Sequence, residues 1–149
     1  MSFKKPISSL VLIYTEEFKV LLMERADKKA FWQSVTGSLE ANETPSEAAA
    51  REVFEETGIH TNQYALEDWH LSHVYEIYAH WRYRYAPNVT HNTEHIFGLK
   101  VPAAIPIQLS ADEHVQYLWL DWKEAMDKVF SWTNVEAIKK LAEIHQLKL

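Results

Sequence analysis

The sequence predicts an α/β (α+β) fold in which a mixed β-sheet has helices packed on it. Runs of β-branched and aliphatic residues bounded by polar or proline-containing segments indicate strands, and two segments have the capping or spacing pattern of helices. The expected order is β-β-β-α-β-β-β-α, which is typical of such a sheet. At 149 residues, the chain is expected to form one domain over residues 1–149.

Three short strands are expected near the start of the chain. Residues 7–14 and 19–24 are aliphatic runs separated by the polar residues 15–17, which indicates a strand pair. Residues 32–38 indicate a third strand that leads into a loop.

The first helix has a capping signature at each end. Thr44 is expected as the N-cap, Pro45 occupies the first helical position, and Glu47 can reach back to the N-cap backbone. Gly58 is expected to supply a left-handed C-terminal cap. The helix should therefore run to about Thr57.

The second half of the chain is expected to hold the remaining strands and a C-terminal helix. Residues 69–85 are aromatic and roughly alternating, which indicates one or two strands ended by a proline segment. Residues 92–101 and 115–121 indicate further strands. Residues 131–146 are expected to form an amphipathic helix, because apolar side chains recur there at spacings of three and four.

Composition excludes several classes of site. With 15 Lys+Arg against 21 Asp+Glu the net charge is −6, which argues against nucleic acid or anionic membrane as a partner. There is no cysteine, so disulfides, thiolate zinc sites and cysteine nucleophiles are excluded. No signal peptide or membrane-spanning run is expected, and the protein is expected to be cytoplasmic. The oligomeric state stays open.

A cluster of carboxylates is the strongest chemical signal. Glu52, Glu55 and Glu56 lie at i, i+3 and i+4 of the first predicted helix, so they share one face. Taken alone, such a cluster is usually a solvated acidic face. Clustered carboxylates also suit hard divalent cations, which would offset the repulsion between an acidic protein and a phosphate substrate.

The surrounding residues resemble a known motif. Gly37-(five)-Glu43-(seven)-Arg51-Glu52-Val53-Phe54-Glu55-Glu56-Thr57-Gly58-Ile59 is similar to the Nudix box, G-x5-E-x7-R-E-U-x-E-E-x-G-U with U aliphatic, at every specified position. Many members carry a second glycine where this chain has Asn42, and asparagine tolerates a left-handed backbone better than most residues. The resemblance implies a Nudix-type α/β/α sandwich with helices on both faces of the mixed sheet. It also implies hydrolysis of a diphosphate bond with Mg²⁺, or Mn²⁺, as cofactor.

The resemblance also implies roles for the residues of the box. Glu52 and Glu56 are expected to be the principal metal ligands, with Glu55 nearby as a ligand or as the base that positions water. Such metals polarise phosphoryl oxygens and lower the pKa of a bound water. The expected structural residues of the motif are Gly37, Glu43, Arg51 and Gly58.

A second, narrower resemblance concerns the substrate. Residues 31–38, 84–87, 92–94 and 131–134 are similar to segments of the dihydroneopterin triphosphate pyrophosphatases, bacterial Nudix enzymes of folate synthesis. This implies conversion of dihydroneopterin triphosphate to the monophosphate and pyrophosphate. The alternatives are a Nudix hydrolase for nucleoside triphosphates, oxidised nucleotides or dinucleoside polyphosphates, and a catalytically silent module that senses a nucleotide or binds RNA.

Several residues outside the box are candidate substrate contacts, each with a plain structural alternative. At the phosphate end, three cations could contact phosphate or could simply be solvated: Lys4, Lys5 and Arg25. Thr36 could donate a hydroxyl hydrogen bond to substrate or could be an ordinary strand residue. At the ring end, Tyr75 or Tyr78 could stack on a pterin and Glu76 could accept hydrogen bonds from its amino-pyrimidine edge, with Ile77 between them. Ser131 could contact substrate or cap the last helix.

Two further segments, residues 112–113 and 91–95, contain residue types that bind metals. Many Nudix enzymes bring a further carboxylate to the metals from the region before the last strand, and the resemblance places it at Glu113, with Asp112 as the alternative. Glu113 is therefore expected to be a further ligand or base. The stretch from His91 to His95 fits the H-x-x-E-H pattern of zinc peptidases, but its strand-like composition argues against that chemistry.

Overall fold

Strand β1 (Ile7–Thr15) lies at the centre of a mixed sheet. In the computed structural model, which describes residues 3–148, β1 pairs in parallel with β6 (His91–Val101) and antiparallel with β2 (Lys19–Arg25) and β4 (Val35–Ser38). All β1 residues from Ser8 onward are buried, as expected for a strand that is covered on both faces. The predicted pairing of the first two strands is confirmed.

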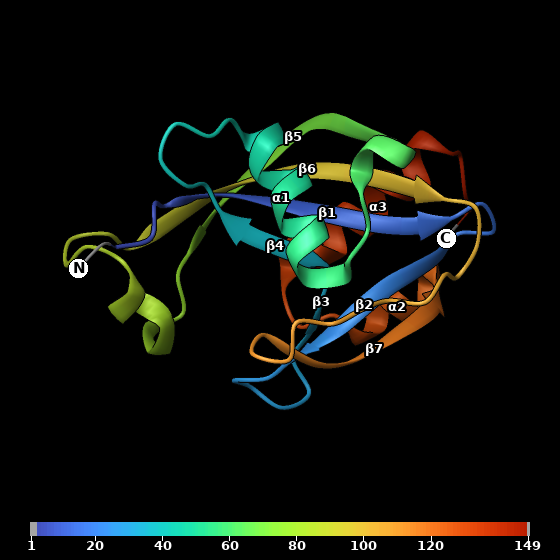
Figure 1. Ribbon diagram of the computed structural model, residues 1–149. Helices are drawn as coiled ribbons and strands as arrows, with labels where there is room; N and C mark the ends of the chain where they lie inside the picture. Colours follow the sequence, from blue (N-terminus) through green and yellow to red (C-terminus); the bar gives the residue numbers. More distant parts are fainter. Residues whose placement is uncertain (1–2, 149) are drawn as a thin grey trace.

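The remaining strands extend the sheet on either side of β1. β5 (Ala65–Glu76) pairs antiparallel with β6, and β7 (His114–Asp121) and β3 (Trp32–Gln33) both pair antiparallel with β2. Within the described residues the sheet has seven strands in the order β3-β2-β1-β6-β5, with β4 on β1 and β7 on β2. Since β4 and β2 both pair with β1 at different heights, the sheet opens between them (Figure 1).

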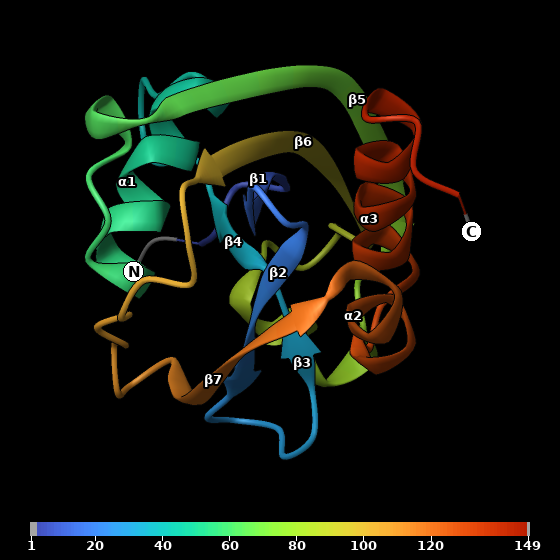
Figure 2. The same ribbon diagram turned by 90° about the vertical axis from the view of Figure 1, so that its right-hand side faces the viewer.

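Helices cover both faces of the sheet, which confirms the predicted α/β/α arrangement. α1 (Pro45–Thr57) lies on one face, and α2 (Trp122–Lys128) and α3 (Trp132–Ile144) lie on the other (Figure 2). Each face has its own apolar cluster, one that includes Ile138 of α3 and one that includes Val53 of α1. Among residues 3–148, no helix combines the length and the apolarity that crossing a bilayer requires.

The ends of α1 have the caps that the sequence predicts. The Thr44 hydroxyl accepts from the Glu47 N–H at 3.1 Å, and a Glu47 carboxylate oxygen accepts from the Thr44 N–H at 2.9 Å. Gly58 closes the helix at φ 77° in the left-handed region. Asn42, in the loop before the helix, adopts φ 67°, which is the conformation expected where many relatives have glycine.

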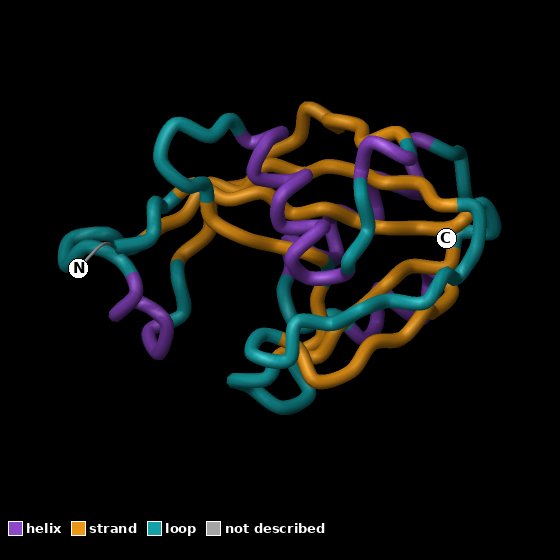
Figure 3. Tube along the Cα trace, in the orientation of Figure 1, coloured by secondary structure: helices purple, strands orange, loops and turns teal. Residues whose placement is uncertain are grey.

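The prediction of strand through residues 69–85 is wrong for its second half. β5 ends at Glu76, and residues 79–84 form a short 3₁₀ helix that lies beside the N-terminal segment (Figure 3). Two contacts explain the change: Tyr78 and Trp81 stack at 5.5 Å, and the Arg82 guanidinium bonds the Ile77 carbonyl at 3.1 Å. The prediction also missed α2, a helix of 7 residues that is too short for a clear periodic pattern.

Candidate active site

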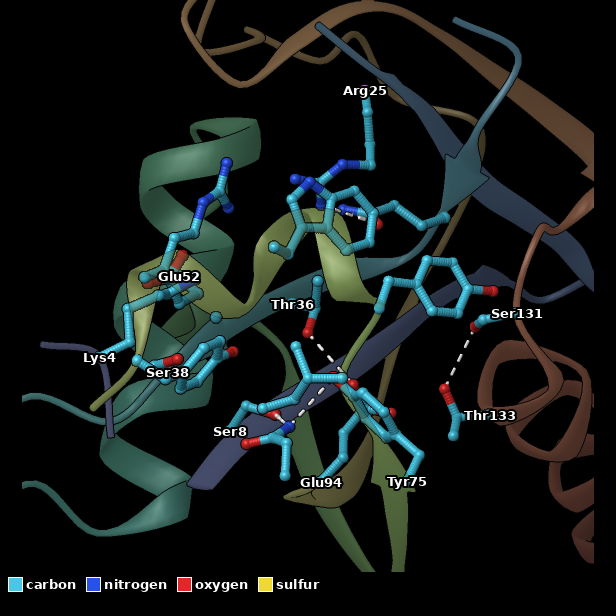
Figure 4. Close-up of a pocket in the computed structure, with 18 of the residues that line it drawn as sticks. Lys4, Ser8, Arg25, Thr36, Ser38, Glu52, Tyr75, Glu94, Ser131 and Thr133 are labelled. Atoms are coloured by element: carbon cyan, nitrogen blue, oxygen red, sulfur yellow. Dashed lines mark hydrogen bonds between the residues drawn. The ribbon is translucent and has the colours of Figure 1, made fainter. Parts of the chain in front are cut away.

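A deep cleft of about 1160 Å³ opens where β4 and β6 meet the end of α1 (Figure 4). Its walls come from the N-terminal segment, strands β1, β4, β5 and β6, the 3₁₀ segment, and the loops before β7 and α3. The predicted site residues that line it are Lys4, Lys5, Arg25, Thr36, Gly37, Glu52, Glu56, Tyr75, Glu76, Ile77, Tyr78, Glu113 and Ser131. The structure thus gathers residues from most of the chain into one cavity.

The three box glutamates of α1 do not share one environment. Glu52 and Glu56 are 8% and 1% exposed and line the cleft, whereas the Glu55 side chain is 51% exposed and lies outside the lining. Gly37 of β4 has no room for a side chain, because the Glu52 carboxyl group would collide with its Cβ. The box glycine therefore allows α1 to bring Glu52 against β4, while the role predicted for Glu55 stays a prediction.

Arg51 ties the box together. Its guanidinium donates two hydrogen bonds to Glu43, at 2.7 and 2.9 Å, and further ones to Glu52 at 2.6 Å and Glu55 at 3.1 Å. It also donates to the carbonyl of Ser38 at 3.0 Å, which joins α1 to the end of β4. The hydrogen bonds from Arg51 hold the pKa of the Glu43 carboxyl below its usual value. These contacts fit the bracing role predicted for Glu43 and Arg51.

Replacing Arg51 should destabilise the fold more than replacing an exposed arginine. We expect Arg51→Lys to lower the free energy of unfolding by about 2 kcal/mol, because an ammonium cannot reproduce the forked contacts to a half-buried carboxylate. In a chain of this size that corresponds to a fall in Tm of roughly 4–8 °C, measurable by circular dichroism. The matched control is Arg82→Lys, which changes a surface pair with Glu76 at 2.5 Å and one hydrogen bond to the Ile77 carbonyl, fewer and more exposed contacts than those of Arg51, and should shift Tm by about 2 °C or less. Equal shifts in the two variants would contradict a bracing role for Arg51.

At one end of the cleft, a buried glutamate, an exposed glutamate and a buried histidine have the composition of a divalent metal site. Donor atoms of Glu56, Glu113 and His114 lie within 4.8 Å of one another. Glu56 Oε1 and His114 Nδ1 are buried without hydrogen-bond partners and lie 3.9 Å apart. Buried polar atoms normally have partners, so an unpaired carboxylate oxygen here fits a cation that supplies the missing contact.

The pKa shifts of the side chains at this end of the cleft also favour a bound cation. Burial, a hydrogen bond with Glu52 and the charges of Glu52 and Glu113 raise the pKa of Glu56 well above its usual value. Partial burial and the charges of Glu52 and Glu55 raise the pKa of Glu113. Burial lowers the pKa of His114 to about 4, so this imidazole is neutral at physiological pH and can act as a ligand. A bound dication would relieve the repulsion among these carboxylates.

Cations surround the mouth of the cleft. Lys4 lies close enough to Glu52 and Glu113 to feel both charges, and desolvation together with Arg84 and Arg25 lowers its pKa. The Arg25 guanidinium is held by Asp27 at 2.7 Å and lies 4.2 Å from the centre of the Trp81 ring. Lys4 is therefore placed for a phosphate near the carboxylates, whereas Arg25, which pairs across the sheet with His114, is held by Asp27.

The predicted ring contacts fall into different surroundings. Tyr75 lies half-buried on the cleft floor and its hydroxyl accepts from Asn92 Nδ2 at 3.1 Å. The Glu76 side chain is 67% exposed and paired with Arg82, so it points to solvent more than to the cavity. Tyr78 stacks on Trp81 at the rim. Ser131 caps α3 by accepting from the Asn134 N–H at 3.3 Å, and it also lines the cleft, so its predicted contact with substrate stays a prediction.

Two cleft residues were not singled out as a site from the sequence. Asn92 and Glu94, on one face of β6, are 1% and 3% exposed and lie on the cleft floor. The sequence carries only part of this signal, an amide and a carboxylate two positions apart in a strand-like run, and their burial is visible only in the structure. The same strand places His91 and His95 four positions apart in extended chain, about 13 Å, which excludes the helical geometry of a zinc peptidase.

Comparisons with known proteins agree with this geometry. Residues 4–141 match the family model of the NUDIX domain. The chain is 44% identical over 143 residues to the dihydroneopterin triphosphate diphosphatase of Haemophilus influenzae, covering 94% of this chain and 89% of that protein, and 45% identical to that of Escherichia coli K12, covering 93% of each. The structure of the E. coli dihydroneopterin triphosphate pyrophosphohydrolase matches with a TM-score of 0.91 and 42% identity, covering 97% of this chain and 99% of that one. The chain therefore belongs to the Nudix hydrolase family, whose members use divalent metal ions, and within it to the dihydroneopterin triphosphate diphosphatases.

Proposed function

We propose that this protein hydrolyses dihydroneopterin triphosphate to dihydroneopterin monophosphate and pyrophosphate, a step of folate synthesis, with Mg²⁺ as its cofactor. The observation that carries the proposal is a single cleft with metal-type carboxylates at one end and buried hydrogen-bonding side chains at the other. Similarity to proteins of that name over nearly the whole chain supports the substrate. Mn²⁺ is an alternative cation, because both ions prefer oxygen ligands.

Glu52, Glu56 and Glu113 are the residues proposed to hold the metal. When bound, a divalent cation stabilises the charge that develops on the phosphoryl oxygens and favours ionisation of water. Arg51 and Glu43 keep α1 against β4, so Glu52 and Glu56 are positioned before substrate arrives. Glu55, exposed beside Arg51, is proposed to hold or orient water at the edge of the site.

Lys4 and Lys5 are proposed to contact the phosphate chain at the cleft mouth. Arg25 would favour its outer phosphates mainly through charge, since Asp27 and Gln33 engage three of its five guanidinium N–H groups. Water that adds to phosphorus must give up a proton, and Glu113, whose pKa is raised by burial and by Glu52, is the proposed acceptor. The departing pyrophosphate leaves with the negative charge that these cations attract.

Product analysis on the purified protein tests this function. We expect kcat/KM for dihydroneopterin triphosphate to be at least about tenfold higher than for GTP or dATP, a difference of roughly 1.4 kcal/mol in transition-state stabilisation. The assay would follow pyrophosphate and the monophosphate in Mg²⁺ buffer, with a dinucleoside polyphosphate and an oxidised nucleotide in the same panel. Equal or faster turnover of a nucleotide would overturn the pterin assignment and leave the family chemistry intact.

We propose that one domain over residues 1–149 carries the activity, in the cytoplasm, on a small-molecule substrate. The net charge of −6 supports the view that nucleic acid and anionic membranes are not partners. All box glutamates are present, which disfavours a catalytically silent module.

A further inference from the structure

The floor of the cleft has two buried acceptor atoms without partners. Glu94 Oε1 and Asn92 Oδ1 make no hydrogen bond within the described residues, and both side chains line the cavity. The other Glu94 oxygen, Oε2, accepts from the Thr36 hydroxyl at 3.3 Å, and the Asn92 amide group donates to Ser8 and Tyr75. Figure 4 shows Glu94 beside Tyr75 and below Thr36, away from Lys4 and Glu52.

Leaving a carboxylate oxygen unpaired at 3% exposure is costly, so such an oxygen in a cleft needs water, an ion or a ligand to complete its contacts. Burial raises the pKa of Glu94 to about 7, while the hydroxyls of Thr36 and Thr133 favour its ionised form. Two further donors would stabilise the ionised form more. The floor therefore suits a ligand edge that presents hydrogen-bond donors side by side.

Only part of the proposed substrate has such an edge. The pterin ring carries a 2-amino group next to the N3–H, and these two donors are spaced like the paired N–H groups of a guanidinium. A carboxylate accepts such a pair in the two-point arrangement that makes arginine–carboxylate contacts specific. The phosphates carry no donors, and the two free hydroxyls of the side chain sit on rotatable carbons, so only the ring holds its two donors rigidly side by side.

We infer that Glu94 is the residue that recognises the amino-pyrimidine edge of the ring, with its carboxylate accepting from the 2-amino group and from N3–H. This inference rests on the proposed function, because it names the part of the pterin that hydrogen-bonds to the cleft floor. Asn92 Oδ1, two positions earlier on the same face of β6, provides a second acceptor for a ring donor.

Thr36 links this contact to the metal end of the cleft. Its backbone lies close enough to the Glu56 carboxylate to offset part of the rise in the pKa of that group, and its hydroxyl donates to Glu94 Oε2 at 3.3 Å. One residue of β4 thus lies between the proposed metal ligand and the proposed ring acceptor. Dihydroneopterin triphosphate has a three-carbon chain between the ring and the phosphates, and the cleft that holds Glu94 also holds Glu56, so the inference assigns the ring and the phosphates to different parts of one cavity.

Glu94 replaces Glu76, which the sequence suggested for this contact. Glu76 is the last residue of β5, and its side chain is mostly solvated and paired with Arg82. Water competes for its oxygens, so it can add little discrimination between rings. Glu94 is already desolvated, so a ring that leaves its carboxylate oxygens without hydrogen bonds binds more weakly by the full cost of the unpaired buried group.

Binding of two ring compounds without phosphate tests the inference separately from hydrolysis. The probes are neopterin and its lumazine analogue, in which oxygen replaces the 2-amino group, titrated against the full chain and followed by calorimetry. We expect the wild type to bind neopterin at least about tenfold more tightly than the analogue, because the analogue places an oxygen against the carboxylate. In Glu94→Gln the preference should fall to threefold or less, roughly.

Two further variants complete the design. Glu143→Gln, an exposed carboxylate on α3 outside the cleft, should keep the wild-type preference. Glu76→Gln tests the rival acceptor: loss of the preference there, with retention in Glu94→Gln, would overturn the inference. Absence of any preference in the wild type would also overturn it. An unchanged Tm in Glu94→Gln would show that the variant folds. If it does not fold, the charge-conserving but shorter Glu94→Asp, which withdraws the carboxylate from the ring and should lose affinity for neopterin, replaces it in the test.

The outcome for Glu94 is independent of the outcome for the proposed function. A protein that prefers neopterin but hydrolyses nucleotides faster would retain the Glu94 contact and lose the assigned reaction. A protein that hydrolyses dihydroneopterin triphosphate without discriminating the two rings would retain the reaction and lose the Glu94 contact.

Discussion

Glu56→Gln should fold normally and hydrolyse dihydroneopterin triphosphate about 1000-fold more slowly than the wild type. Glu56 is 1% exposed, faces Glu113 and His114, and has an oxygen without a hydrogen-bond partner. A neutral amide of the same shape is a weak ligand for a hard cation, so metal affinity and charge stabilisation should both fall. A 1000-fold loss corresponds to roughly 4 kcal/mol of transition-state stabilisation.

The fold of this variant should be at least as stable as that of the wild type in the absence of metal. Burial and the neighbouring charges of Glu52 and Glu113 raise the pKa of Glu56, so ionising it costs stability that the neutral glutamine does not lose. Measurement of kcat across Mg²⁺ concentrations checks the expected loss of turnover. Tm recorded with and without Mg²⁺ checks the expected stability of the variant.

Glu47→Gln is the matched control on the same helix. Glu47 is exposed and closes the capping box with Thr44, a contact that glutamine also makes. Its activity and its Tm should stay close to the wild-type values. If Glu56→Gln kept Mg²⁺-dependent turnover within about tenfold of this control, the metal role assigned to Glu56 would be wrong.

The parts of the fold that the sequence predicted well are those coded over short distances. The start of α1 depends on Thr44 and Glu47, three positions apart, and its end depends on Gly58. The segment after β5 was misjudged because its alternating aromatics pack on one another: Tyr78 stacks on Trp81, which also lies edge-on to Phe31 from another loop. Whether such aromatics form a strand or a 3₁₀ turn depends on that distant partner.

In the candidate site too, residues of a contiguous motif could be predicted, and residues that depend on distant partners could not. The box glutamates could be found because their motif is contiguous, but the structure alone distinguishes buried Glu56 from exposed Glu55. Glu94 could not be assigned from its neighbours, since its contact with Thr36 spans 58 positions and depends on β1 pairing with both β4 and β6. The burial of Glu94 could be recognised only once the register of β6 in the sheet was known.

Glu113→Ala is expected to reduce kcat about 100-fold and to change KM by less than about threefold. Glu113 lies in the loop before β7, outside the box, and its carboxylate reaches the group formed by Glu56 and His114. Its pKa is raised by partial burial and by Glu52 and Glu55, which brings it closer to the range in which a carboxylate accepts a proton from water.

The split between kcat and KM separates a role in the reaction from a role in binding. A group that acts on water and on the metal contributes mainly in the transition state, so its loss should leave substrate affinity nearly intact. The comparison is Asp112→Ala, which removes a neighbouring carboxylate that lines the same cleft but does not belong to the close group of donors. Glu113→Ala should be at least about tenfold slower than Asp112→Ala. A larger loss in Asp112→Ala would move the role to that residue, and a change confined to KM would make Glu113 a substrate contact.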